Sequence, residues 1–319
     1  MATYGFHASH EQFGPAELLD LTRAAEQAGF SAAMCSDHFA PWSRAQGHSG
    51  HAWAWLGAAL AVTGFPLGVV TAPGQRYHPA VLAQAAATLT DLSPGRLWVA
   101  LGTGQALNEH ITGDRWPSKP ARTRRLEECV EVIRALFRGE TVSHDGLVRV
   151  DRARLWPPPQ EPPALLAAAV TPSTARWAAG WADGLITINQ PDDAHRTTLA
   201  AYRDDGGTGP AVLQVHLSWA DDPQTALAAA HEQWREAALG SEVGWEISLP
   251  EHFEEAARFI DPPQLTPFVH VSADLSEHAD WLAAQGDAGF DQVMIHQVGR
   301  DQRAFIEAFG DHVLPRVRS

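Results

Sequence analysis

Cysteine is nearly absent from this chain of 319 residues, which contains only Cys35 and Cys129. Two cysteines cannot form the disulfide framework of a small secreted protein. Each lies in an apolar stretch, where a free buried thiol is common. The first residues contain no basic segment followed by an apolar one, and nowhere do about 18 apolar residues run together. We therefore expect a cytoplasmic protein.

Positive charge is also scarce, since 23 Lys and Arg residues face 38 Asp and Glu residues and give a net charge of −15. Such a chain is repelled by a nucleic acid backbone and by an anionic membrane surface. We expect neither as a partner and predict a small-molecule substrate instead. The 45% of hydrophobic residues is enough for a large core and excludes a disordered protein.

No linker rich in Pro, Gly or Ser divides the chain, so residues 1–319 are predicted to form a single domain. Short apolar, strand-like runs alternate with longer helical patterns, the first of which covers residues 15–29. Strands of this kind imply a parallel sheet covered on both faces. Eight of them in about 300 residues favour a closed (β/α)8 TIM barrel over an open sheet. The eight runs are Tyr4–Phe6, Phe30–Ser36, Leu67–Thr71, Leu97–Gly102, Leu165–Val170, Leu185–Ile188, Val212–Leu217 and Val293–His296.

Two kinds of insertion are expected in this barrel. A hairpin is predicted at about residues 140–160, from Val142 to Leu155, with its turn at Asp145-Gly146. Further insertions are expected at the C-terminal face, where the catalytic groups of such barrels lie.

The segment SDHFAPW (residues 36–42) follows the second apolar run, so Asp37 and His38 are expected at the barrel mouth. His7 and His296 end other strands and are expected there too. A histidine with a pKa near 6.5 can accept a proton at neutral pH, and Trp42 can supply an apolar wall. This combination suits proton abstraction from a hydroxyl group. The alternative is that His38 only bonds a backbone carbonyl at a strand end.

Three other features could serve a ligand. Gly102-Thr103-Gly104 would let a flat ligand or a phosphate approach the backbone. Thr171 is a plausible N-cap of a helix whose free N–H groups could bind an anion, or of an ordinary capped helix. Glu11 could face the mouth, or could merely place negative charge at a helix N-terminus.

The chain has sixteen histidines, which raises the question of a metal site. His7 and His10 are three residues apart, as are His48 and His51. The first strand has no His-x-His pair, and the strand ends show no ligand pattern of His and Asp. No metal site is predicted, and a metal-dependent hydrolase remains an alternative function.

Six segments together resemble the luciferase-like flavin oxidoreductase superfamily, and within it the branch of the glucose-6-phosphate dehydrogenases that use the deazaflavin coenzyme F-420. The resemblance implies a (β/α)8 barrel and a homodimer. It also implies that His38 is the catalytic base, that Asp37 and Trp42 help to hold cofactor and substrate, and that Glu11 lies in the active site. The six segments are HASHEQF (7–13), SDHFAPW (36–42), GQRYHPAVLAQAAATL (74–89), GTGQALNEHITG (102–113), ADGLIT (182–187) and GRDQRAFIEAFGDHVLPRV (299–317).

This resemblance and the motifs give two sets of candidate residues. The catalytic candidates are His38, Trp42, Glu11 and Gln105. The cofactor-binding candidates are Asp37, His38, Thr71, Gly102, Thr103, Gly104, Gln105, Asn108, Ala169, Val170 and Thr171.

The chain departs from the pattern of these dehydrogenases at several positions. Gln105 replaces a Glu thought to protonate the reduced deazaflavin, and an amide cannot carry that proton. Asn189 and Gln190 stand where a Lys that grips the sugar phosphate is expected, the stretch 264–267 lacks a later Arg, and Ala169-Val170 replaces phosphate-binding glycines.

These departures predict a substrate without a phosphate group, and not a glucose-6-phosphate dehydrogenase. The remaining candidate cations at the mouth are Arg76 and Arg300, and the candidate pocket walls are Trp42, Trp53 and Trp116.

Phrases such as AMCSDHF (33–39) look most like a subgroup thought to use FMN, so FMN is slightly favoured over coenzyme F-420. We predict an oxidoreductase that transfers hydride to or from a small alcohol or carbonyl compound. A monooxygenase and a non-catalytic flavin-binding protein on the same fold are the alternatives.

Overall fold

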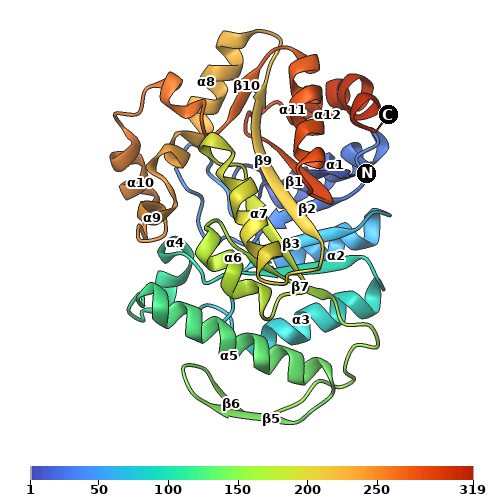
Figure 1. Cartoon of the computed structure of the whole chain (residues 1–319), viewed down its shortest axis with the longest axis vertical. Helices are drawn as coiled ribbons and strands as arrows, with labels where there is room; N and C mark the ends of the chain where they lie inside the picture. The colour runs from blue at the N-terminus through green and yellow to red at the C-terminus, as the bar shows by residue number, and fades with distance from the viewer. Residues whose placement is uncertain (1, 319) are drawn as a thin grey trace.

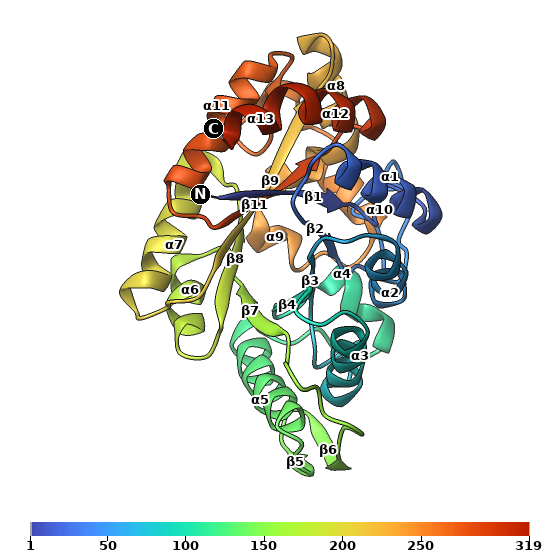
Figure 2. The ribbon, with the colours of Figure 1, turned by 90° about the vertical axis from the view of Figure 1, so that its right-hand side faces the viewer.

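Eight parallel strands form a closed barrel in the computed structural model, which describes residues 2–318. Strand β9 pairs with β8 on one side and with β11 on the other, and this double pairing closes the sheet. Figure 2 shows the strands around a common centre with helices outside them. The predicted TIM barrel is confirmed, and every predicted run contains a strand. The barrel strands are β1 (Thr3–Ala8), β2 (Ala33–Ser36), β3 (Leu67–Thr71), β4 (Leu97–Leu101), β7 (Ala164–Ala168), β8 (Gly184–Ile188), β9 (Ala211–Trp219) and β11 (Gln292–Gln297).

Helices follow the strands and begin at residues suited to that position. Helix α1 has Pro15 in its first turn, and the chain leaves it at Gly29 with φ +96°, a conformation that favours glycine. Among residues 2–318, no helix is both long and apolar enough to cross a membrane. The helices are α1 (Pro15–Gln27), α2 (Ala52–Val62), α3 (Pro79–Leu92), α4 (Ala106–Glu109), α5 (Lys119–Phe137), α6 (Pro172–Ala179), α7 (Ala194–Asp204), α8 (Pro223–Trp234), α9 (Ser241–Gly244), α10 (Pro250–Ala257), α11 (Leu275–Asp287), α12 (Gln302–Ala308) and α13 (Leu314–Val317).

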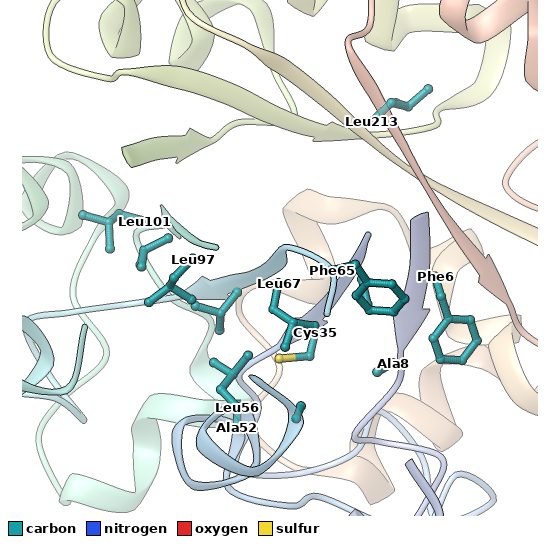
Figure 3. Packing of buried hydrophobic residues seen from close by; sticks show 14 of the residues in the cluster. Phe6, Ala8, Cys35, Ala52, Leu56, Phe65, Leu67, Leu97, Leu101 and Leu213 are labelled. Atoms are coloured by element: carbon teal, nitrogen blue, oxygen red, sulfur yellow. The ribbon is translucent and has the colours of Figure 1, made fainter. Parts of the chain in front are cut away.

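The strands alternate between two hydrophobic clusters. The outer cluster lies between strands and helices, and Figure 3 shows part of it, including Phe6, Cys35 and Leu67. The inner cluster fills the barrel and consists of Ala32, Met34, Trp98, Ala100, Leu166, Ile186, Val212 and Met294. Because successive strand residues point to opposite faces, residues two or more positions beyond this inner layer face the barrel mouth.

Two insertions interrupt the alternation of strands and helices. Strands β5 (Val142–Asp145) and β6 (Arg149–Ala153) form the hairpin, which turns near the expected Asp145-Gly146. It lies along the outside of α5, where the Glu128 carboxylate accepts hydrogen bonds from the backbone N–H of Val148 and from the His144 ring. The hairpin therefore adds nothing to the C-terminal face.

The segment of residues 220–269, which we call the lid, covers the barrel mouth between β9 and the short strand β10 (His270–Ser272). It carries α8, α9 and α10, and Figure 1 shows α9 and α10 beside α4. The carbonyl of Trp245 accepts a hydrogen bond from the N–H of Ala106 at 2.9 Å, and Glu254 pairs with Arg44 at 2.6 Å. The lid is thus attached to the loops that follow β2 and β4.

Gly68 tests the inner packing of the barrel, because an added Cβ would lie 1.9 Å from the Trp98 ring. We expect Gly68→Ala to lower the free energy of unfolding by about 1–3 kcal/mol, because the buried ring must move. Chemical denaturation measures this, with Gly57→Ala as control, where the nearest atom lies at 3.5 Å. Equal stability of the two variants would contradict the described packing.

Candidate active site

A cavity of about 450 Å³ opens at the C-terminal ends of the strands, beneath the lid. This size suits a small-molecule site. Of the predicted residues, only Thr171 does not line it. Its hydroxyl accepts a hydrogen bond from the N–H of Thr174, which lines the cavity in its place. The predicted residues on the cavity wall are Glu11, Asp37, His38, Trp42, Thr71, Gly102, Thr103, Gly104, Gln105, Asn108, Ala169 and Val170.

His38 and Glu11 form a buried pair in this wall. Nδ1 of His38 lies 3.1 Å from Oε1 of Glu11, and Ser9 donates a hydrogen bond to the other oxygen at 2.9 Å. Burial, together with the positive charge of Arg76, lowers the pKa of His38 to about 4, while burial raises the pKa of Glu11. The imidazole is therefore neutral at pH 7, and the carboxyl group can stabilise it if it takes up a proton.

Trp42 lies beside this pair and connects it to the lid. Its ring centroid is 5.2 Å from that of His38 and 5.1 Å from that of Phe253 on α10, both in edge-to-face geometry. All three side chains line the cavity. They form an apolar wall that keeps water from one side of the imidazole.

Asp37 is held by three side chains from the loop after β3. Its carboxylate accepts hydrogen bonds from Thr71 at 2.8 Å and Tyr77 at 3.3 Å, and lies 3.4 Å from the Arg76 guanidinium. Arg76 also donates to the carbonyl of Asp37 and lies 3.7 Å from the buried carboxylate of Glu109. The loops after β2 and β3 are thus fixed to each other.

Neither of the two cations predicted for the mouth lines the cavity. Arg76 is engaged with Asp37 and Glu109. Arg300 lies over the Phe13 ring and donates to backbone carbonyls of residues 45 and 46.

The segment after β4 forms a glycine-lined wall. Gly104 has φ +84°, and a Cβ there would lie 3.1 Å from Cγ of Glu109, so the position requires glycine. Asn108 accepts a hydrogen bond from the N–H of Phe39 and donates one to Oε1 of Gln105. The backbone of residues 102–104 is therefore held open toward the cavity, where a flat ligand can approach it.

The cations that line the cavity are ones that sequence reasoning missed, Lys119 and Arg122, both at the start of α5. Arg122 lies over the Trp116 ring and 3.1 Å from Glu246 of the lid. Lys119 lies over the Trp245 ring. Because α5 follows β4 in the chain, these cations are on the same side of the cavity as the glycine segment.

Two of the three predicted tryptophan walls are wrong. Trp53 is buried in the outer core, because α2 turns this residue inward, and Trp116 packs under Arg122. The tryptophans that join Trp42 in the wall are Trp177 on α6 and Trp234 and Trp245 of the lid. The lid tryptophans lie in a segment without regular hydrophobic spacing, so nothing in the sequence marked them.

The opposite wall, at the ends of β8 and β9, is polar and largely uncharged. Oδ1 of Asn189 accepts a hydrogen bond from the N–H of His216, and Gln190 donates one to the carbonyl of Val170. Burial lowers the pKa of His216 to about 4 and that of His296 well below its usual value. His7, His216 and the amide of Gln214 line this wall, whereas the predicted His296 lies behind them. Strand alternation, which places Gln214 and His216 on the inner face, was the signal that could have found them.

Within residues 2–318, no three His, Cys, Asp or Glu side chains are arranged to hold a metal ion.

Comparison with known proteins extends the likeness beyond the fold. Two curated relatives are F420-dependent glucose-6-phosphate dehydrogenases. The one from Microbacterium testaceum is 35% identical over 99% of this chain and 97% of its own, and the one from Nakamurella multipartita is 36% identical over 99% and 96%.

Solved structures agree with these relatives. An F420-dependent secondary alcohol dehydrogenase, in complex with an F420-acetone adduct, is 27% identical and covers 100% of this chain and 99% of its own, with a TM-score of 0.90. A coenzyme F420 dependent tetrahydromethanopterin reductase from Methanopyrus kandleri shares the fold at 21% identity, with a TM-score of 0.77 over 99% of each chain. A family model described as luciferase-like monooxygenase matches residues 2–292, and the chain therefore belongs to this family of flavin- and F420-dependent oxidoreductases.

Proposed function

We propose that this protein is a coenzyme F-420-dependent oxidoreductase that interconverts a small, non-phosphorylated alcohol and its carbonyl compound. The observation that carries the proposal is the neutral imidazole of His38, backed by Glu11, on the wall of a cavity that also contains the open backbone of residues 102–104.

The chemistry follows from these positions. His38 accepts the proton of the substrate hydroxyl, and the Glu11 carboxyl group 3.1 Å away stabilises the imidazolium that results. Trp42 and Phe253 exclude water from this proton transfer. Gln105 can orient a ligand by hydrogen bonding but cannot donate the proton that a Glu would supply. A deazaflavin bound in the cavity would accept the hydride.

The cofactor is proposed from the wall made by residues 102–105, Ala169, Val170 and Thr174. Small side chains and open backbone fit a flat ring, and Lys119 and Arg122 on the same side fit the anionic groups of a cofactor tail. The relatives that share about 35% identity are named for F420, and no comparison supports the expected preference for FMN. We therefore propose coenzyme F-420.

The absence of a phosphate group on the substrate is proposed from the opposite wall, since the curated relatives are named for glucose 6-phosphate. A phosphate dianion loses several kcal/mol when it leaves water without cationic partners. Asn189, Gln190 and His216 form that wall, and the cavity's Lys119 and Arg122 lie on the cofactor side. The secondary alcohol dehydrogenase of similar structure supports the same choice.

The role of His38 is tested by His38→Ala. We expect kcat to fall by about 10²–10⁴, because the proton acceptor is lost, with a much smaller change in cofactor affinity. Steady-state kinetics and cofactor fluorescence titration measure the two quantities. His252→Ala, at an exposed position of α10, is the control. Unchanged turnover in His38→Ala would mean that the histidine only supports the strand end.

The cofactor is tested by equilibrium binding of coenzyme F-420 and FMN to the ligand-free protein. We expect coenzyme F-420 to bind more tightly, and the double variant Lys119→Gln, Arg122→Gln to lose most of this preference because its anionic tail loses two cationic partners. Arg149→Gln, on the exposed hairpin, is the control. Tighter binding of FMN would reject the proposal.

The substrate class is tested by kinetics with 2-propanol, cyclohexanol and glucose 6-phosphate in the presence of coenzyme F-420. We expect turnover of the secondary alcohols and no saturable turnover of the sugar phosphate, since the substrate wall offers it no cation. Saturation by glucose 6-phosphate at micromolar concentration would show that Lys119 or Arg122 serves the substrate.

A further inference from the structure

The lid places one carboxyl group in the cavity that the chemistry above does not use. Glu236 lies in the helical turn Arg235–Leu239 directly after α8, and only 6% of its surface is exposed. It lines the cavity together with Trp234 and Ala237. In the described part of the chain, neither of its carboxylate oxygens has a hydrogen-bond partner.

The charged neighbours of Glu236 do not satisfy it. Nε of Arg235, the preceding residue, lies 3.7 Å from Oε1, beyond hydrogen-bond distance. Glu254 on α10 is the other charged group that acts on it, with the opposite sign of effect, and Glu254 is itself held by Arg44. Burial is the largest influence and raises the pKa of Glu236 to about 7.

An unpartnered buried carboxyl group destabilises a fold, and a glutamine or an apolar side chain of similar size would avoid much of that cost. Glu236 contributes to no ion pair that holds the lid in place, in contrast to Glu246 and Glu254. Its free oxygens lie in the same cavity as Gln214 and His216, which are neutral hydrogen-bonding groups. A ligand that carries hydrogen-bond donors would complete this set.

We propose that Glu236 is a specificity-determining residue that accepts a hydrogen bond from a second hydroxyl group of the substrate, apart from the one that reacts with His38. The substrate is then a diol or polyol without a phosphate group, since the same carboxylate repels an anion. This inference rests on the proposed alcohol chemistry and names the substrate class of that site.

The test compares cyclohexanol with the 1,2-, 1,3- and 1,4-cyclohexanediols in the F-420-loaded protein, which differ only in the second hydroxyl group and its position. We expect at least one diol to have a lower KM than cyclohexanol. Glu236→Ala should raise the KM of that diol by about 10–100-fold, the loss typical of a hydrogen bond to a charged group, and leave kcat and the KM of cyclohexanol unchanged. Glu242→Gln, at an exposed position of the lid, is the control.

The pH dependence separates recognition from a merely structural role. The carboxylate is the better acceptor, so the KM of the preferred diol should fall as the pH rises from 6 to 8 in the natural protein, and should stay constant in Glu236→Gln. The pKa of Glu236 in the folded protein lies above its value in the unfolded chain, so stability falls with pH between about 4.5 and 7. Glu236→Gln should remove this fall, which thermal unfolding at pH 5 and pH 8 measures.

The outcomes are distinct. Equal effects of Glu236→Ala on cyclohexanol and all diols, or no effect on any, would overturn the inference, and a selective effect on 2-aminocyclohexanol would replace the hydroxyl group by an ammonium group. If the natural protein oxidises none of these alcohols, the proposed function fails. Their dissociation constants, measured by quenching of the cavity tryptophans, then decide the role of Glu236 on the same criteria.

Discussion

Closure of the barrel by β9 is the constraint on which the other features depend. This strand pairs with both β8 and β11, and its register fixes which of its residues face inward. Val212 lies in the inner cluster, so Gln214 and His216 face the cavity above it. A slip of one residue would turn these side chains toward the helices and bring apolar ones into the mouth.

Burial then sets the protonation states within the closed barrel. The inner cluster seals the barrel below the cavity, the lid covers it above, and little water reaches the histidines between them. His38 and His216 are therefore neutral at physiological pH, although their unperturbed pKa would leave a fraction charged. The positive charge that lines the cavity comes from Lys119 and Arg122 at the start of α5. Acid-base chemistry and anion binding are thus kept in different parts of one cavity.

The sequence allowed the barrel and much of its mouth to be predicted, because both depend on local signals. The apolar runs place the strands, and the residues directly after them, such as Asp37, His38 and Gly102, must lie at one end of a parallel barrel. The prediction failed where position depends on packing between distant segments. Trp53 faces the core because of how α2 packs, and Thr171 turns its hydroxyl to its own helix.

The lid was beyond prediction for a different reason. Residues 220–269 contain short helices without regular hydrophobic spacing, so the sequence does not indicate that Trp234, Glu236 and Phe253 fold back over the mouth. Their positions result from contacts with loops more than a hundred residues away, such as the bond between Trp245 and Ala106. Propensity and spacing do not report contacts of this range.

The lid is one continuous stretch between two strands, whereas the residues that bind the proton and the proposed cofactor come from other strand ends. Mutations in residues 220–269 can therefore accumulate without altering His38, Glu11 or Gly104. After gene duplication, one copy could acquire a new substrate by divergence of this single segment while inheriting its redox chemistry intact. The architecture separates what evolution can vary from what it must keep.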